Sequence, residues 1–138
     1  TSYILIGLVV LIIGGFGLSK YLQSNDPNVA STGAFHWHPN LTIYVKGQKQ
    51  EIPANIGIGA VHQPMHTHTE DASQGVVHLE FGGAARNDEI TLSKFFETWG
   101  KDINSFGENM TMTVNGEPST EFGNHVFKDG EKVELRYE

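Results

Sequence analysis

An uninterrupted apolar segment near the N-terminus constrains the architecture of this chain more than any other feature of the sequence. Residues 3–22 are apolar apart from one serine and Lys20. A helix of about 20 residues spans roughly 30 Å, the thickness of the hydrocarbon core of a bilayer. Tyr3 and Tyr21 lie where interfacial aromatic side chains are common. Residues 1–22 are therefore predicted to form a single transmembrane anchor helix.

This segment has two other interpretations, a cleaved signal peptide and a pilin-like filament helix. A cleaved signal peptide is disfavoured because no A-x-A cleavage site follows, and because the apolar run exceeds the usual length of about 7–15 residues. A pilin-like helix that packs against its own copies in a filament remains open. The four glycines of the segment would let another helix approach closely. The expected partners are thus the membrane and a membrane protein or a second copy bound through this helix.

The rest of the chain is acidic and contains no cysteine. Lys20 is the only charged side chain of the first 22 residues, so residues 23–138 carry 8 basic and 16 acidic side chains, a net charge of −8. Such a surface repels nucleic acid, and it offers no basic patch for anionic headgroups. Without cysteine, disulfides, thiolate-bound zinc, iron–sulfur clusters and thiol catalysis are excluded.

Residues 23–35 are polar and turn-rich and are predicted to be a linker, which leaves residues 36–138 as one extracytoplasmic domain. Short alternating segments separated by turns predict a mainly β (α+β) fold, a compact antiparallel β domain with one short helix. That helix is expected over residues 89–100, with Thr91 or Ser93 as its cap and Gly100 at its end. Residues 125–127 and 132–137 are expected to form a last hairpin. The expected strands are residues 41–45, 50–52, 75–81, 110–114, 125–127 and 132–137.

Histidine is the unusual residue of the domain. His36 and His38 form one H-x-H pair, and His66 and His68 form another. In an extended strand, residues i and i+2 point to the same face, so each pair presents two imidazoles to one ion. His78 lies in a predicted strand, and a tight connection through residues 71–75 would fold it back beside the second pair. These five histidines are the predicted metal ligands.

The remaining histidines and the nearby carboxylates have other expected roles. His62 and His125 lack such spacing and are predicted not to be ligands. Glu80, foremost, and also Glu70 and Asp71 are expected to accept a hydrogen bond from the free ring nitrogen of a ligating histidine. In a zinc hydrolase, the same carboxylates would be candidates for the general base.

The choice of metal follows from the ligand type. Imidazole suits copper, zinc and nickel, and the affinity of a given nitrogen site is highest for copper(II). Copper is therefore the expected cofactor, with zinc as the alternative. No catalytic residue is predicted, because no nucleophile motif or phosphate-binding glycine loop is present. Asn40 and Asn109 begin N-x-T sequons and are candidate glycosylation sites.

Two resemblances to known families add to this interpretation. The MHTHTEDA segment is similar to the H-x-H motif of cupins, although Glu70 follows too soon after His68. The fuller resemblance is to an uncharacterised family of membrane-anchored archaeal and bacterial proteins, and it covers about residues 36–138. It implies that His36, His38, His66, His68, His78 and Glu80 belong to one unit. The motifs that carry the resemblance are HWHPNL, IPANIGI, MHTHTEDASQGVVHLE, LSKFFETWG and MTVNGEP.

These features together predict a single-pass protein of the cell membrane with its C-terminal domain on the extracytoplasmic side. The expected function is transition-metal binding, as an accessory or metal-supplying subunit of a membrane complex such as a copper monooxygenase or oxidase. Two alternatives stay open. One is a surface or filament subunit whose histidines bind metal, and the other is a small metallohydrolase.

Overall fold

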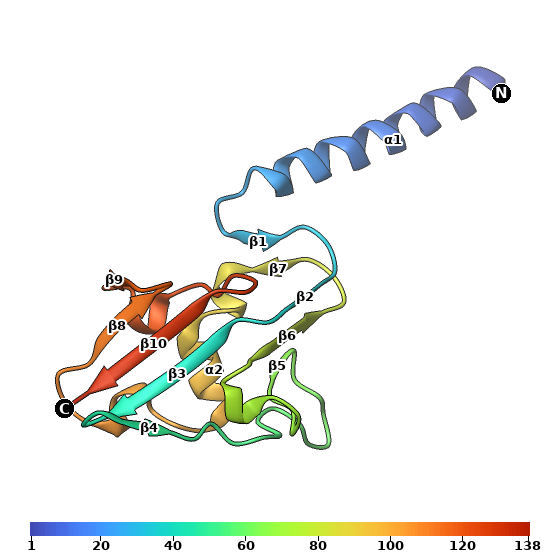
Figure 1. Ribbon diagram of the computed structural model, residues 1–138. Helices are drawn as coiled ribbons and strands as arrows, with labels where there is room; N and C mark the ends of the chain where they lie inside the picture. Colours follow the sequence, from blue (N-terminus) through green and yellow to red (C-terminus); the bar gives the residue numbers. More distant parts are fainter.

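The computed structural model describes residues 1–138 and contains a long N-terminal helix that extends away from a β-rich domain (Figure 1). Helix α1 (Ser2–Ser24) buries none of its side chains, and it is long and apolar enough to cross a membrane. Its last turn is closed by Ser24 and Asn25, whose side chains donate hydrogen bonds of 2.9 and 2.7 Å to the Tyr21 carbonyl. Pro27, two residues further on, cannot continue the helix.

Part of the predicted linker pairs with the domain. Strand β1 (Val29–Ser31) lies antiparallel to β7 (Ala85–Arg86) in a two-stranded sheet. Asn87 strengthens this attachment, because its side-chain amide donates to the Pro27 carbonyl at 2.8 Å and its backbone N–H donates to the Asn28 carbonyl. The chain is therefore fastened to the domain within a few residues of the end of α1.

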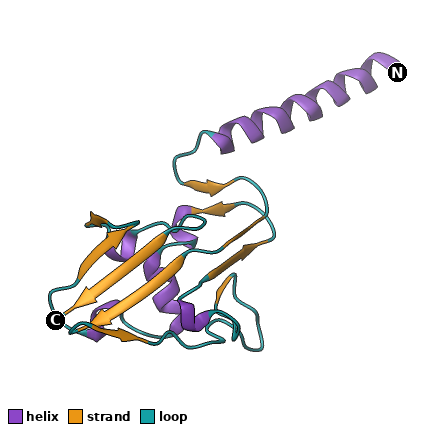
Figure 2. Ribbon diagram, viewed as in Figure 1, coloured by secondary structure: helices purple, strands orange, loops and turns teal.

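A five-stranded sheet in the order β4-β3-β10-β8-β9 forms one half of the domain (Figure 2). Strands β3 and β10 run parallel, and the other neighbours are antiparallel. Along β3 and β10 alternate residues are buried, as the period of a strand facing one core requires. The strand bounds are β3 (Asn40–Val45), β4 (Gln48–Gln50), β8 (Thr111–Val114), β9 (Glu117–Ser119) and β10 (Lys132–Tyr137).

The predicted last hairpin is wrong. Residues 125–127 do not pair with β10, which is instead inserted between β3 and β8. In this central position both edges of β10 are hydrogen-bonded and Val133 and Leu135 are buried, whereas a hairpin alone would satisfy one edge. Phe127 is fully buried and donates its N–H to the Ile90 carbonyl. Residues 125–127 therefore pair with the backbone just before the second helix, which begins at Leu92. Hairpins form instead at Lys46-Gly47 and at Asn115-Gly116, and the strand expected over residues 50–52 lies two residues earlier, as β4.

Helix α2 (Leu92–Trp99) confirms the one short helix expected in the domain. The Thr91 hydroxyl accepts from the Lys94 N–H at 3.2 Å, and Gly100 ends the helix in the left-handed conformation. The buried face of α2 packs on the hydrophobic core that also holds Leu41, Val133 and Leu135. Short 3₁₀ turns connect the larger elements: η1 (Ala72–Gln74), η2 (Asn87–Glu89), η3 (Ile103–Phe106) and η4 (Phe122–Asn124).

A second, three-stranded sheet has the order β2-β6-β5, with β2 (Phe35–Trp37), β5 (Met65–His66) and β6 (His78–Phe81) all antiparallel. One face of this sheet is apolar: Trp37 and Met65 lie opposite Leu79, and all three pack with the core. Trp37 is partly buried in this position. Because side chains alternate along a strand, the histidines occupy the other face.

Gly75 controls how closely β6 approaches β3. It ends η1 with a φ of +84°, its carbonyl accepts from the Leu41 N–H at 2.8 Å, and a Cβ atom there would collide with the Leu41 carbonyl. An L-residue would therefore meet both backbone strain and a steric clash.

We expect Gly75→Ala to lower the free energy of unfolding by about 2–3 kcal/mol or more. Gly83→Ala is the matched control, because it has no positive φ and no atom within 4 Å of an added Cβ. Urea denaturation followed by tryptophan fluorescence would measure both variants. Equal stability of the two variants would contradict this role of Gly75.

Candidate metal centre

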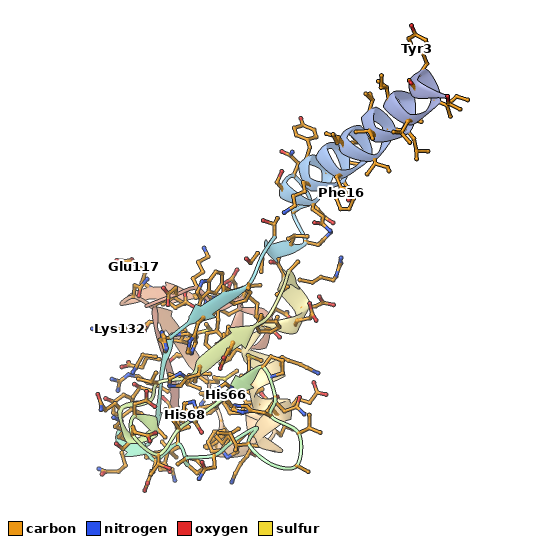
Figure 3. All side chains as sticks on the ribbon, turned by 90° about the vertical axis from the view of Figure 1, so that its right-hand side faces the viewer. Tyr3, Phe16, His66, His68, Glu117 and Lys132 are labelled. Atoms are coloured by element: carbon orange, nitrogen blue, oxygen red, sulfur yellow. The ribbon has the colours of Figure 1, made fainter.

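Strand register brings the predicted ligands onto one face of the β2-β6-β5 sheet. His66 of β5 lies directly opposite His78 of β6, and His36 of β2 lies opposite Glu80 of the same strand. His38 and His68 follow two residues after His36 and His66, just beyond the ends of their strands. Figure 3 shows His66 and His68 on the side of the domain that carries these strands. The predicted fold-back of His78 beside the second pair is confirmed.

His78 lies between the two H-x-H pairs. Ring centroids are 4.5 Å apart within His36 and His38, and 4.7 Å within His66 and His68. The centroid of His78 is 4.8 Å from that of His38 and 4.5 Å from that of His68. Two groups of three could each hold an ion: His36, His38 and His78, which we call the outer triad, and His66, His68 and His78, which we call the inner triad.

Nitrogen atoms from different rings come within the spacing that a shared ion imposes. His66 Nε2 and His68 Nε2 are 3.2 Å apart, and His36 Nε2 and His78 Nδ1 are 3.4 Å apart. A tetrahedral ion with metal–nitrogen bonds of about 2.0–2.1 Å separates its ligand atoms by about 3.3 Å. An ion could therefore bind between these nitrogens with little movement of the rings.

Two oxygen atoms fix which nitrogen each ring offers. His66 Nδ1 donates to the Gln63 carbonyl at 2.9 Å, which leaves a lone pair on Nε2, the atom that faces His68. His78 Nε2 donates to Asp71 Oδ2 at 2.8 Å, which leaves a lone pair on Nδ1, the atom that faces His36. Such hydrogen bonds orient a ring and raise its basicity as a ligand.

The electrostatics of the cluster favour neutral rings. Burial lowers the pKa of His66, and the neighbouring His62 and His68 add to this effect against the opposing hydrogen bond of Gln63. Partial burial, together with the nearby His36 and His78, lowers the pKa of His38. Neutral imidazole is the form that binds a metal ion. These two histidines are therefore available as ligands at neutral pH.

The three acidic residues chosen from the sequence differ in their positions. Asp71 holds His78, and its second oxygen, Oδ1, is buried without a hydrogen-bond partner, a position that a cation bound nearby would stabilise. Glu80 is mostly exposed, with its Oε2 4.0 Å from His66 Nε2. Glu70 is exposed and forms no hydrogen bond with the histidines. Asp71 therefore takes the orienting position that the sequence favoured for Glu80.

His62 is the residue of this region that the sequence argument set aside. Its ring centroid lies 4.3 Å from that of His66 and 6.3 Å from that of His68, although its side chain is exposed. A tight loop places it there, closed by the N–H of Gln63 donating to the Gly57 carbonyl at 2.8 Å. In the sequence, Gly57 is the local sign of a turn here, and in the structure it has a positive φ. A glycine does not by itself predict which way the side chain of His62 points.

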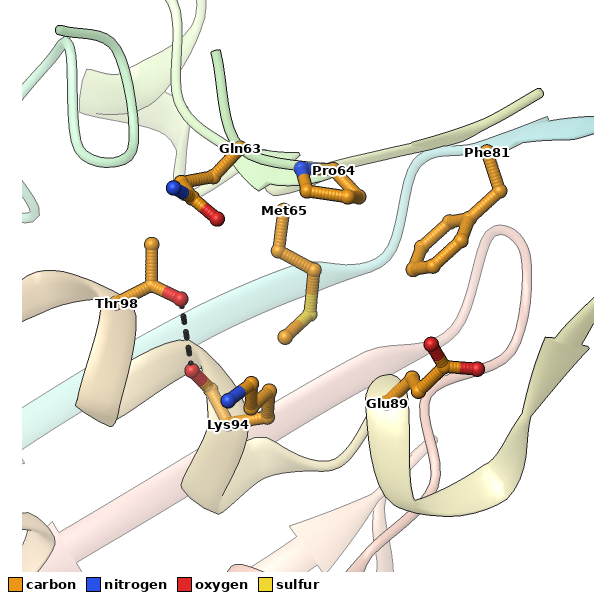
Figure 4. Close-up of a pocket in the computed structure, with 7 residues that line it drawn as sticks. All are labelled: Gln63, Pro64, Met65, Phe81, Glu89, Lys94 and Thr98. Atoms are coloured by element: carbon orange, nitrogen blue, oxygen red, sulfur yellow. Dashed lines mark hydrogen bonds between the residues drawn. The ribbon is translucent and has the colours of Figure 1, made fainter. Parts of the chain in front are cut away.

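A polar hollow of about 320 Å³ opens beside the inner triad and is lined by His62, Gln63, Pro64, His66, Glu80 and Gly82. Gln63 and Pro64 also line a second hollow, of about 190 Å³, between this segment and α2 (Figure 4). The second hollow contains no histidine, and Thr98 there donates to the Lys94 carbonyl at 3.0 Å. The first hollow therefore gives solvent access to His66 of the inner triad.

The two sequon asparagines use their side chains within the fold. Asn40 is half-buried and donates to the Gln74 carbonyl at 2.6 Å, and Asn109 donates to Glu138 Oε2 at 2.9 Å. Attachment of a glycan to either side chain would compete with these hydrogen bonds.

Comparisons of the chain with protein-family models, with curated protein sequences and with solved structures find no match. The function therefore has to be argued from the arrangement of the residues themselves.

His125 is buried and lies far along the chain from the other histidines. Both of its ring nitrogens have a carboxylate partner. Its Nδ1 lies 2.8 Å from Glu121 and its Nε2 lies 2.7 Å from the buried Glu131. Burial alone would lower the pKa of His125, but the hydrogen bonds and charges of Glu131 and Glu121 outweigh it and raise the pKa. His125 belongs to neither triad.

The raised pKa predicts a pH dependence of stability. The charged form of His125 stabilises the fold fully below the unfolded-state pKa of about 6.5, and this contribution is lost as pH rises through the higher folded-state pKa. We expect His125→Gln to remove a stabilisation on the order of 1 kcal/mol at pH 6 and less at pH 8.5. Urea denaturation of the full chain in detergent, at a series of pH values, would measure the difference. A difference that grows with pH would contradict the charge assignment.

Proposed function

We propose that this chain is a membrane-anchored extracytoplasmic protein that binds a transition-metal ion through His36, His38, His66, His68 and His78. The observation that carries this proposal is the convergence of two H-x-H pairs on His78, with nitrogen separations of 3.2 and 3.4 Å. Five imidazoles gathered on one face of a sheet are costly to bring together without a common ligand, since His66 and His78 are buried there and lose their hydration.

Copper is the favoured ion and zinc the alternative. All the proposed ligands are nitrogen atoms, no cysteine is present, and nitrogen sites bind copper(II) most tightly among the divalent first-row metals. The three methionines do not support a thioether site for copper(I): Met65 and Met112 are buried in the core, and Met110 packs against it.

Helix α1 supports a role at the membrane. Its apolar side chains are all exposed, so lipid or the helices of another membrane protein would have to cover them. We propose that the protein serves as an accessory or metal-supplying subunit of a membrane complex, such as a copper monooxygenase or oxidase. Native material that is instead polymeric, with metal between chains, would favour the filament alternative.

A small metallohydrolase is the second candidate, and the polar hollow beside His66 favours it. Glu80 lines that hollow and could act as a general base on a metal-bound water. This candidate requires turnover that Glu80→Gln abolishes while the bound metal is retained.

The proposal predicts that the full chain, purified in detergent, retains copper after gel filtration. We expect His66→Ala/His68→Ala to lose most of the bound metal, because two of the three inner ligands are removed, and elemental analysis would measure it. Glu117→Ala/Lys132→Ala is the control, because both side chains are exposed on the other sheet, away from His66 and His68 (Figure 3). Circular dichroism would verify that each variant is folded.

A metal-free wild-type protein that also fails to take up added copper(II) or zinc(II) would overturn the proposal. Loss of metal in the Glu117→Ala/Lys132→Ala control would show that the cluster is not responsible. His62→Ala is a single-histidine control, and we expect it to retain the ion, since His62 belongs to neither triad.

Asp71 provides a separate test of the same site. We expect Asp71→Asn to weaken metal affinity by about 10–100-fold, because the carboxylate that orients His78 and raises its basicity is lost. Competition against a chromogenic chelator would measure the affinity, with Glu70→Gln as the matched control one residue away. Equal affinities for these two variants would contradict the orienting role of Asp71.

A further inference from the structure

We propose that the cluster holds one ion at a time in two alternative positions that share His78. The outer triad would receive or release the ion, and the inner triad would retain it. This inference rests on the proposed metal-binding function and concerns how the ion enters and leaves the site. It is carried by three features: the unequal burial of the two triads, the single free nitrogen of His78, and the position of the His78 ring between the pairs.

The two triads differ in their access to solvent. His36 and His38 are exposed, whereas His66 is fully buried and His68 is half-buried. His78 is 8% exposed and belongs to both groups. An ion in the outer triad could therefore be reached by a ligand from a partner protein or by water. An ion in the inner triad would be bound by the buried His66 and the half-buried His68, and solvent would reach it from the hollow lined by His62 and Glu80.

His78 can serve only one ion at a time. Its Nε2 is held by Asp71 at 2.8 Å, so Nδ1 alone carries a free lone pair. A single lone pair binds a single ion, which makes the outer and inner triads alternatives. Two ions would require His78 to lose its one remaining ring proton, on Nε2, and Asp71 to give up its hydrogen bond.

The same arrangement allows the ion to move without being released. The bond to His78 persists, while the bonds to His36 and His38 break and those to His66 and His68 form. The ring centroid of His78 lies 4.8 Å from that of His38 and 4.5 Å from that of His68, so the ring adjoins both pairs. Its free Nδ1 lies 3.4 Å from His36 Nε2. No charge or electron is exchanged, because neutral imidazoles replace neutral imidazoles.

The experiment uses the full chain in detergent with copper(II) as the probe. Titration followed by electron paramagnetic resonance gives the stoichiometry and the nitrogen environment, and stopped-flow mixing with copper or with a chelator gives the rates of uptake and release. The outer variant His36→Ala/His38→Ala is compared with the inner variant His66→Ala/His68→Ala and with the control Glu117→Ala/Lys132→Ala. Because His66 is buried, a His66→Gln/His68→Gln variant is included in case the alanine variant fails to fold.

We expect the wild type to bind one copper per chain. The outer variant should show the wild-type resonance spectrum, because the ion rests in the inner triad, but should take up and release copper about tenfold more slowly. The inner variant should take up one copper on titration, with a different spectrum, but should lose it on gel filtration because its release is faster than that of the wild type. The control should match the wild type in every measurement.

Two results would overturn this inference while leaving the proposed function intact. One is a wild-type protein that binds two copper ions with spin-coupled signals, which would show that His78 bridges two ions. The other is an outer variant whose uptake and release rates equal those of the wild type. If neither the wild type nor any variant bound copper, the result would contradict the proposed function itself.

Discussion

The pairing of β6 with β2 on one side and β5 on the other is the constraint on which the histidine cluster depends. Leu79 is fully buried in the core, so its neighbours His78 and Glu80 must point to the opposite face. A shift of one residue in either pairing would turn the histidines of β2 or β5 into the core and expose Trp37 or Met65. The hydrophobic core therefore fixes the positions of the imidazoles, although it touches none of the nitrogens proposed to bind metal.

Clustering imidazoles on a sheet face has an energetic consequence for the ion-free protein. The rings of His38 and His66 are kept neutral by burial and by their neighbours, since their pKa values are lowered. The nitrogens of His66 and His68 are 3.2 Å apart, and those of His36 and His78 are 3.4 Å apart. In each pair one nitrogen can donate a hydrogen bond to the other, but protons on both nitrogens would repel each other. An ion that binds between them would link β2, β5 and β6, so metal binding and domain stability should be coupled.

Much of this site was accessible from the sequence, because it depends on local periodicity. The i, i+2 spacing of His36 and His38 and of His66 and His68 predicts their shared face, and the short connection of residues 71–75 predicts the return of His78. The position of His62 was not accessible, because it follows from a loop closed by a backbone hydrogen bond between Gln63 and Gly57. The insertion of β10 between β3 and β8 was missed for a related reason. A parallel neighbour far away in the chain leaves no local signal, whereas the turn at residues 128–130 suggests a hairpin.

The charge of the domain and the apolar helix both bear on the proposed binding and exchange of a metal ion. A net charge of −8 over residues 23–138 attracts metal cations towards the surface, and it gives the domain no affinity for anionic headgroups. Attachment through β1 keeps the domain within a few residues of the end of α1, so an exposed outer triad would remain close to any membrane partner of that helix. Tethering raises the effective concentration of one site at another without requiring a strong direct interface. Under the proposed two-position arrangement, the exposed outer triad would suit exchange with a tethered partner, because such exchange needs accessibility more than affinity.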